Sequence, residues 1–418
     1  MLFYIGIILL SLISLQLLIF AWQQLRSYRH NQRSHQLEIQ LLKAQLAEKT
    51  LANTIADATQ PGWSGWRKFR VRDIVKENRI IKSYYLVPHD GKPPGVFLPG
   101  QHLTFKLKVS GLSKPVIRCY TLSDSPKAND YYRVTIRKQT APAEKDDAVD
   151  GVASCYFHEQ LKPGDILDVK SPNGKFFLDT TENSPVVLIA GGVGLTPALS
   201  MLNTLLADRS ERDIWLFYGA RDHNDQIMTE HFKLVQQQLN NFHLFKLFSD
   251  ENADVSKDLS AHKGRVTTDF IQQQGTPLDS DFFICGPAGM MKTINDGLRN
   301  LGVDEQRIHF ESFGPASIKA ENRKVNTDNT TDTATHKLEF GLSGKSVEWN
   351  QSSGTVLDAA EAAGIQIDSG CRAGSCGTCL TAVLEGQVSY VEEPGMTVED
   401  GSFLPCVAIP KSNLKLNA

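Results

Sequence analysis

The sequence lacks the features that would indicate a nucleic-acid-binding protein or a repeat protein. It has no block of lysine and arginine with interleaved aromatic residues, and it contains no internal repeat. Because its net charge is −3 and its isoelectric point is about 6.4, we expect no nucleic-acid partner. The 418 residues, 41% hydrophobic and 22% charged, are enough for two or three globular domains.

Charged side chains are absent from residues 1–22. A helix of this length is ~33 Å long, enough to cross a hydrocarbon core of ~30 Å. Three arginines follow before the first acidic residue, and no basic residue precedes the segment, so the positive-inside rule places the later residues in the cytoplasm. The alternative, a cleaved signal peptide, needs a basic beginning and a small-residue cleavage site. The sequence thus predicts a transmembrane anchor and a single-pass protein of the inner (cytoplasmic) membrane with cytoplasmic catalytic domains.

Proline and glycine are absent from residues 23–60, where leucines recur at near-helical intervals. This pattern predicts an amphipathic stalk helix that ends at Pro61. The stalk could pair with a second copy, lie along the membrane or serve as a solvated spacer. Aromatic residues are absent from residues 316–335, a segment rich in Thr, Asn and Asp that has the composition of a linker.

Cysteine is scarce, and four of the seven cysteines lie near the C-terminus in a recognisable spacing. Cys371-x4-Cys376-x2-Cys379 is followed by Cys406 after 26 intervening residues. This is the plant-type spacing of [2Fe–2S] ligands, and thiolates are the soft ligands that such a cluster needs. A structural zinc site would more often show two Cys-x2-Cys pairs, and disulfides would need an oxidising compartment. We therefore predict a [2Fe–2S] cluster held by these four cysteines.

The middle of the chain changes its pattern near residue 183. Short alternating runs at residues 69–72, 102–107, 132–136 and 166–169, separated by Gly and Pro, predict a small antiparallel β-barrel. Residues 186–190 then form a continuous apolar run, followed by the glycine turn Gly191–Gly194 and a helical stretch. More apolar runs at 214–218, 242–245 and 282–285 alternate with helical segments, which indicates a doubly wound parallel sheet that binds a nucleotide.

Several motifs in this order resemble the ferredoxin–NADP⁺ reductase superfamily, most closely the reductase half of flavohaemoglobins, and residues 334–418 resemble a plant-type ferredoxin domain. The expected fold is multi-domain: a flavin barrel, an α/β nucleotide domain, an α+β ferredoxin-like (β-grasp) domain and a transmembrane helix. The expected segments are the anchor 1–22, the stalk 23–60, the FAD-binding barrel 61–182, the NAD(P)H-binding domain 183–315, the linker 316–335 and the [2Fe–2S] domain 336–418.

The resemblance implies a flavin site on the barrel. Arg118-x-Tyr120-Thr121 is similar to the family's flavin motif, in which Arg pairs with the pyrophosphate, the aromatic ring stacks on the flavin and the hydroxyl bonds ring N5. Gly151 and Ser154 lie in a stretch that resembles the second phosphate turn and favours FAD over FMN. His102 occupies a flavin-contacting position where the family usually has Tyr.

The resemblance also implies a pyridine-nucleotide site. Two stretches resemble the nucleotide turn and the second nicotinamide motif, and they contribute Gly191, Gly192, Gly194, Thr196, Pro197, Gly286 and Pro287. Cys285 would stand beside the nicotinamide carbon that gives up hydride, although it could instead be an inert buried strand end. In the family's C-terminal signature, Phe313 would shield the flavin and Glu311 would lie close to the hydride path.

The expected activity is electron transfer from NADH or NADPH through FAD to the [2Fe–2S] cluster and on to an electron-accepting protein, an oxygenase or desaturase at the membrane. Arg221 could recognise the extra phosphate of NADPH, but Asp222, Asp250 and Glu251 would oppose it, which favours NADH. One alternative is that the protein is the electron-entry subunit of a respiratory NADH:quinone-type complex, although in such subunits the ferredoxin domain precedes the flavin domain. Another is a redox-sensing binding module.

Overall fold

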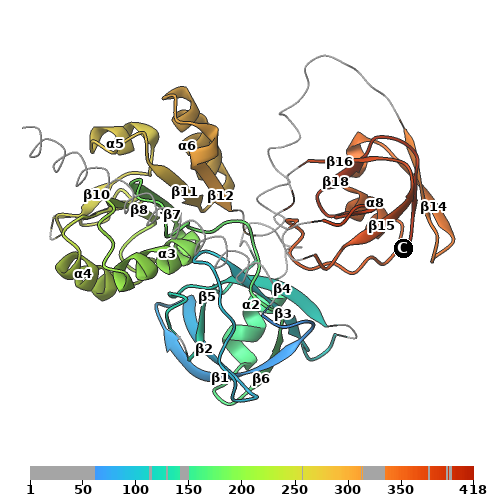
Figure 1. The fold of residues 1–418 in the computed structure, drawn as a ribbon, viewed down its shortest axis with the longest axis horizontal. Helices are drawn as coiled ribbons and strands as arrows, with labels where there is room; N and C mark the ends of the chain where they lie inside the picture. Colours follow the sequence, from blue (N-terminus) through green and yellow to red (C-terminus); the bar gives the residue numbers. More distant parts are fainter. Residues whose placement is uncertain are drawn as a thin grey trace, which may run out of the picture. The chain divides into compact units, whose positions relative to one another are not determined.

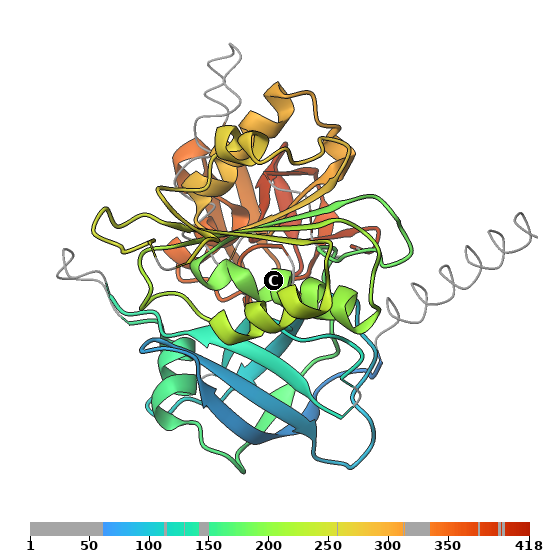
Figure 2. The same ribbon diagram turned by 90° about the vertical axis from the view of Figure 1, so that its left-hand side faces the viewer.

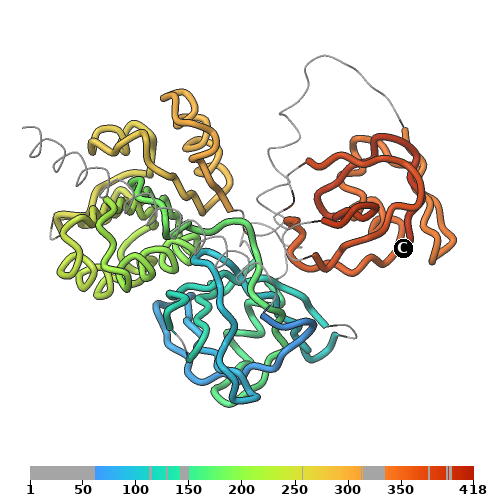
Figure 3. Tube along the Cα trace, viewed as in Figure 1, coloured from blue at the N-terminus to red at the C-terminus, as the bar shows by residue number. Residues whose placement is uncertain are grey.

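The computed structural model describes most of the chain after residue 61. The described residues are 62–112, 115–128, 130–141, 150–256, 258–311, 313, 335–374, 377–391, 394 and 398–418. They belong to one compact unit, Ala58–Ala418. The predicted anchor and stalk lie outside the described residues, as does the predicted linker apart from its last residue. Figure 3 follows the described chain in sequence order from blue to red.

The first domain is an antiparallel barrel (Figure 1). Its sheet has the order β4-β3-β6-β1-β2-β5, and a bridge between Leu122 and Val134 brings the end of β4 to β5, which closes the sheet. The strands are β1 (Arg67–Lys76), β2 (Ile81–Pro88), β3 (His102–Leu107), β4 (Val116–Thr121), β5 (Tyr132–Arg137) and β6 (Ile166–Val169). Each predicted run in this region coincides with a strand or part of one.

The aromatic side chain of Phe157 packs in the hydrophobic core of the barrel. The short helix α2 (Val152–Cys155) leads into a π-helical turn, Tyr156–Gln160, that carries Phe157. The Phe157 ring is fully buried and meets the rings of Tyr84, Phe105 and Tyr120 edge-on, with centroids 5.1, 5.4 and 5.2 Å away. This packing places Tyr120 and the following Thr121 at a fixed position on β4.

The second domain is a parallel sheet with the order β10-β9-β8-β7-β11-β12. The chain order reverses between β7 and β11, so the carboxyl ends of these two strands form the switch point at which such sheets bind ligands. The strands are β7 (Val186–Gly191), β8 (Ile214–Ala220), β9 (Phe242–Phe248), β10 (Ala261–Lys263), β11 (Asp281–Cys285) and β12 (Ile308–Glu311). The predicted doubly wound fold is confirmed.

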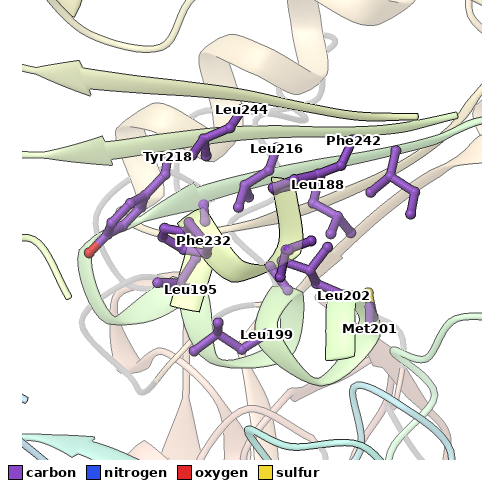
Figure 4. Packing of buried hydrophobic residues seen from close by; sticks show 14 of the residues in the cluster. Leu188, Leu195, Leu199, Met201, Leu202, Leu216, Tyr218, Phe232, Phe242 and Leu244 are labelled. Atoms are coloured by element: carbon purple, nitrogen blue, oxygen red, sulfur yellow. The ribbon is translucent and has the colours of Figure 1, made fainter. Parts of the chain in front are cut away.

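Helices cover both faces of this sheet, as Figure 2 shows. Alternate residues of β7 serve the two faces: Leu188 packs in the core beside α3 and α4, and Val187 and Ile189 pack in the core beside α5 and α6. Figure 4 shows the first of these cores. The helices are α3 (Leu195–Ala207), α4 (Thr229–Gln238), α5 (Thr268–Gln273) and α6 (Ala288–Asn300).

Helix α3 lies between the sheet and the barrel. It contains no charged residue, and its residues from Leu195 to Leu205 are all buried, as expected of a helix covered on every side. On the barrel side, Ser200 donates to the Asp124 carbonyl at 2.8 Å, and Asn203 Nδ2 donates to Asp124 Oδ1 at 2.7 Å. These contacts hold the glycine turn that precedes α3 against the barrel.

The C-terminal domain is a mixed sheet with one helix against it. The order β14-β13-β19-β15-β17 includes one parallel pair, β13 with β19, as in a β-grasp fold. The sheet strands are β13 (His336–Phe340), β14 (Lys345–Trp349), β15 (Thr381–Glu385), β17 (Ser402–Phe403) and β19 (Leu414–Leu416). The helix is α8 (Val356–Ala362), and a second small sheet pairs β16 (Val388–Tyr390) with β18 (Ala408–Pro410).

The membrane localisation predicted from the sequence was wrong. Among the residues that the structure describes, no helix combines the length and the apolar character needed to cross a membrane. The prediction relied on one uncharged run, residues 1–22, and on the arginines that follow it, all of which lie outside the described residues. The prediction therefore rested on hydropathy and charge asymmetry alone.

Candidate functional site

A cavity of about 800 Å³ collects most of the predicted flavin and nicotinamide residues. The barrel contributes the ends of β3 and β4, and the nucleotide domain contributes the ends of β7, β11 and β12. The predicted residues that line it are His102, Arg118, Tyr120, Thr121, Gly191, Gly192, Gly194, Thr196, Gly286, Pro287, Glu311, Phe313 and Cys371. The sequence motifs, which are far apart in the chain, thus share one site.

Three polar side chains, those of His102, Thr121 and Glu311, lie close together in this cavity. Thr121 Oγ1 donates to Glu311 Oε2 at 3.4 Å, and His102 Nδ1 lies 4.0 Å from Glu311 Oε1. His102 and Thr121 are cross-strand partners on β3 and β4, which explains why they point to the same place. His102 is buried, and a Cβ atom at Gly174 would lie only 3.0 Å from its Nδ1. Here the chain accommodates a histidine where the family usually has tyrosine.

Glu311 stands beside Cys285 because β12 and β11 pair in parallel with these two residues in register. Burial raises the pKa of the Glu311 carboxyl to about 8, with the hydrogen bond from Thr121 opposing the shift. Burial, and secondly Glu311, raise the pKa of the Cys285 thiol well above its ordinary value. At neutral pH both groups are therefore uncharged, so this end of the site is neutral.

The two glycine turns touch each other at the switch point. A side chain at Gly194 would overlap the Cys285 carbonyl, and one at Gly286 would approach Gly191 N at 3.0 Å. Glycine is therefore required here because two backbone segments pass at contact distance. The open space above the turns can accept a ligand that needs close backbone approach.

Four predicted residues of the flavin and nicotinamide sites lie behind the lining of the cavity: Cys285, which is buried at the end of β11, Gly151, Ser154 and Pro197. Ser154 Oγ accepts from Gln139 N at 3.0 Å, and Gly151 N donates to the Gln139 carbonyl at 2.8 Å; Gln139 itself lines the cavity. Pro197 lies in the first turn of α3, just after Thr196. These residues position others, and the cavity lining does not include them.

A second cleft of about 700 Å³ opens on the other side of the same glycine turn. Gly191, Gly192 and Pro287 line both spaces. Further along, the cleft is lined by Arg221, Ser249, Arg265 and Thr293 at the carboxyl ends of the parallel strands and on α6. An elongated dinucleotide can therefore extend from the first cavity into this cleft.

The predicted cluster ligands come from two segments of the C-terminal domain. Cys379 Sγ and Cys406 Sγ are 3.2 Å apart and buried, and Cys371 Sγ accepts the Ala373 N–H at 3.4 Å. Cys376 lies outside the described residues, and no group of three metal-binding side chains forms among the residues that are described.

The loop that carries Cys371 also lines the flavin-side cavity. Gly370, Cys371, Arg372 and Ala373 contribute to its lining, and Arg118 Nη1 donates to the Gly370 carbonyl at 3.3 Å. Arg372 adopts a left-handed conformation, with φ of 57°, and forms an ion pair with Glu361 on α8. The cluster loop is thus tied at one side to the barrel and at the other to its own helix.

Sequence reasoning missed several lining residues. Thr135, Arg137 and Gln139 extend from β5 into the first cavity, and Ser249 and Arg265 line the second cleft. The alternation of β5 could have indicated which of its residues face the site. No signal in the sequence distinguished Arg265 from the other exposed arginines.

Comparisons with known proteins agree with this arrangement. Residues 77–178 match an oxidoreductase FAD-binding domain, residues 188–296 an oxidoreductase NAD-binding domain, and residues 341–411 a 2Fe-2S iron-sulfur cluster binding domain. The chain belongs to the ferredoxin–NADP⁺ reductase superfamily. The predicted cofactors, FAD, a pyridine nucleotide and a [2Fe–2S] cluster, are confirmed at the level of these domains, and so is the prediction of an oxidoreductase.

Flavohemoproteins and an oxygenase reductase are among the proteins that this chain resembles. A flavohemoprotein from Bacillus cereus is 37% identical over 260 residues, which cover 61% of this chain and 63% of the relative. The FAD/NAD-binding domain of a nitric oxide dioxygenase from Vibrio cholerae superposes with a TM-score of 0.54 and 30% identity, over 60% of this chain and all of that domain. Phthalate dioxygenase reductase, at 24% identity and a TM-score of 0.52, shares the fold over 85% of this chain and 98% of its own.

Proposed function

We propose that this protein is an NAD(P)H-dependent reductase that passes electrons through FAD to a [2Fe–2S] cluster and then to a separate acceptor protein. The observation that carries the proposal is the shared cavity: barrel motif, nucleotide turns and cluster loop all line one space. The chain spans about 63% of the length of the flavohemoprotein relatives, so their whole activity is not transferred to it.

The cavity residues fit a flavin. Its volume of about 800 Å³ lies within the usual range for cofactor sites, and it offers an aromatic ring, a hydroxyl and a guanidinium from one strand. FAD, when bound, accepts a hydride from a nicotinamide and releases electrons one at a time. In this proposal Tyr120 packs on the flavin ring, Thr121 bonds its edge and Arg118 binds phosphate, with Gly151 and Ser154 supporting Gln139.

The nucleotide turns orient the donor. Gly191, Gly192 and Gly194 let the dinucleotide approach the amino end of α3, whose N–H groups and dipole favour phosphate. Gly286 and Pro287 form the opposite wall, with Cys285 and Glu311 uncharged beside the nicotinamide. Phe313, half-exposed at the cavity, covers the flavin when no nicotinamide is bound. Hydride transfer needs no general base, so Cys285 and Glu311 can remain uncharged during this step.

NADH is the proposed donor. Arg221 lines the second cleft, but its Nε lies 3.7 Å from Asp222 Oδ2, and this carboxylate weakens the attraction for an extra phosphate. Comparing kcat/KM for NADH and NADPH tests this step. A preference for NADPH would contradict it.

Cys371, Cys376, Cys379 and Cys406 are the proposed cluster ligands. Cys371 lies on the loop that lines the flavin cavity, which supports electron transfer from the flavin into this side of the cluster. Oxygenases and desaturases take up electrons singly, and proteins of this kind are the proposed acceptors. The test is anaerobic mixing of the reconstituted protein with NADH while flavin absorbance and the electron paramagnetic resonance of the cluster are recorded. A cluster that stays oxidised while the flavin is reduced would refute the relay.

A further inference from the structure

The C-terminal domain exposes an apolar strip that begins beside a cluster ligand. Leu380 directly follows Cys379, and Leu380, Ala382 and Leu384 alternate along β15 with residues that face the core. Leu380 is 41% exposed and Leu384 is 53% exposed. A sheet face that points to solvent in a small domain usually carries polar residues, so exposed leucines at these positions require an explanation.

The direction of these side chains follows from the strand pairing. Thr381 pairs with Phe403, which is fully buried, so Thr381 faces the core and its neighbours face outward. Leu384 lies at a register shift between β15 and β19. A Cβ atom at Gly341 would lie 3.9 Å from Leu384 Cδ1, and Gly341 N donates to the Leu416 carbonyl on β19 at 2.8 Å, so Leu384 lies close to the turn that contains Gly341 and Leu342.

In this turn Leu342 is 77% exposed and adds a further apolar side chain near Leu384. We call Leu380, Ala382, Leu384 and Leu342 the leucine face; β15 is labelled in Figure 1. In contrast to Gly370–Ala373, none of these residues lines the flavin-side cavity. In the proposed function the cluster receives electrons on the side of Gly370–Ala373. This side shares no residue with the leucine face.

Carboxylates border the leucine face. Glu399 and Asp400 are exposed in the turn before β17, and Val383 N donates to the carbonyl of the next residue, Gly401, at 2.8 Å. Glu385 follows Leu384 and is exposed, with Lys415 3.4 Å away. Residues 336–418 hold ten Asp and Glu against five Lys and Arg, whereas the whole chain is nearly neutral. The negative charge of the chain is thus concentrated in this domain.

We propose that the leucine face is the surface on which the electron acceptor docks, and that this acceptor is a protein with an apolar patch ringed by basic residues. The proposal rests on the proposed function, because it needs a cluster that delivers electrons. An acceptor seated on the leucine face is next to Cys379, so the electron leaves through the ligand that the docked protein approaches. The acidic border attracts a basic partner and aligns it, and the leucines hold it.

The test uses the full-length protein loaded with FAD and cluster, with NADH as donor and mitochondrial cytochrome c as probe, a basic haem protein that accepts single electrons. Ferricyanide reduction, which needs no docked protein, corrects each rate for the content of active enzyme. The double variant Leu342→Ser with Leu384→Ser leaves Leu380 and the ligands untouched. We expect its kcat/KM for cytochrome c to fall about tenfold. The matched control is Leu259→Ser, which removes a fully exposed leucine from the nucleotide domain.

A second variant, Glu399→Gln with Asp400→Asn, tests the acidic border. We expect a smaller dependence of the cytochrome c rate on ionic strength than in the wild type. A double leucine variant within twofold of the control would overturn the proposal. So would sedimentation that shows a wild-type dimer dissociated by Leu384→Ser, because the leucine face would then bind a second copy. A wild-type protein whose cluster NADH cannot reduce would instead refute the proposed function itself.

Discussion

Replacing Glu311 by glutamine should stabilise the nucleotide domain relative to the wild type, and this difference in unfolding free energy should grow as the pH rises. The Glu311 side chain is only 14% exposed, lies beside Cys285 of β11 and has a pKa of about 8, compared with 4.5 in its ordinary state. Below pH 4.5 the carboxyl is protonated in both the folded and the unfolded protein, and no difference arises. Between pH 4.5 and 8 only the unfolded state loses the proton, so rising pH favours unfolding of the wild type.

The magnitude follows from the shift. A difference of about 3.5 pKa units corresponds to at most about 5 kcal/mol, lost at about 1.4 kcal/mol per pH unit across this window. Glutamine resembles the protonated carboxyl and can keep the hydrogen bond from Thr121, so the Glu311→Gln protein should lack this slope.

Hydrogen exchange on flavin-free protein, read by mass spectrometry on peptides that cover β11 and β12, measures the opening free energy at each pH. The reasoning requires that the difference between variant and wild type grow from pH 5 to pH 8 and then level off. A constant difference, or a wild type that gains stability over this window, would show that Glu311 is ionised in the folded protein.

Four further changes test other parts of the structure. Cys379→Ser should remove iron and sulfide from the reconstituted protein while the flavin absorbance remains, and a variant that keeps the cluster spectrum would exclude Cys379 as a ligand. Gly194→Ala introduces a methyl group onto the Cys285 carbonyl, so the rate of flavin reduction by NADH should fall at least tenfold; an unchanged rate would mean that the turn can move aside. Phe157→Ala leaves a hole among three rings and should lower the unfolding free energy of the barrel by about 3–5 kcal/mol in urea titrations. Arg212→Met removes the more buried of the two arginines that pair with Asp281, and because Arg307 stays paired with this carboxylate the unfolding free energy should fall by only about 1.5–3 kcal/mol; an unchanged free energy would show that Arg307 alone satisfies Asp281.

Periodicity predicted the elements whose burial is regular. The run 186–190 is apolar throughout because β7 is covered on both faces, and the run 102–107 coincides with β3. In the barrel and the nucleotide domain, strands β2, β4, β10 and β12 and helix α2 were not predicted. The burial of β2 departs from strict alternation because the neighbours Ser83 and Tyr84 are both buried, and β10 has only three residues.

The site was predictable where one residue type has few physical roles. Glycines at Gly191, Gly194 and Gly286 indicated close backbone approach, and the structure shows two turns in contact. The proximity of Cys371 to the flavin motif could not be read from the sequence, because it depends on how the C-terminal domain meets Arg118. The same holds for the neutral state of Glu311, which burial alone produces.

The most direct test of the electron relay is an anaerobic titration of the reconstituted protein with NADH. If FAD accepts two electrons and the cluster accepts one, full reduction requires about 1.5 equivalents of NADH, and the signal of the reduced cluster appears before this point is reached. Complete flavin bleaching at one equivalent, with a cluster that remains oxidised in excess NADH, would contradict the account.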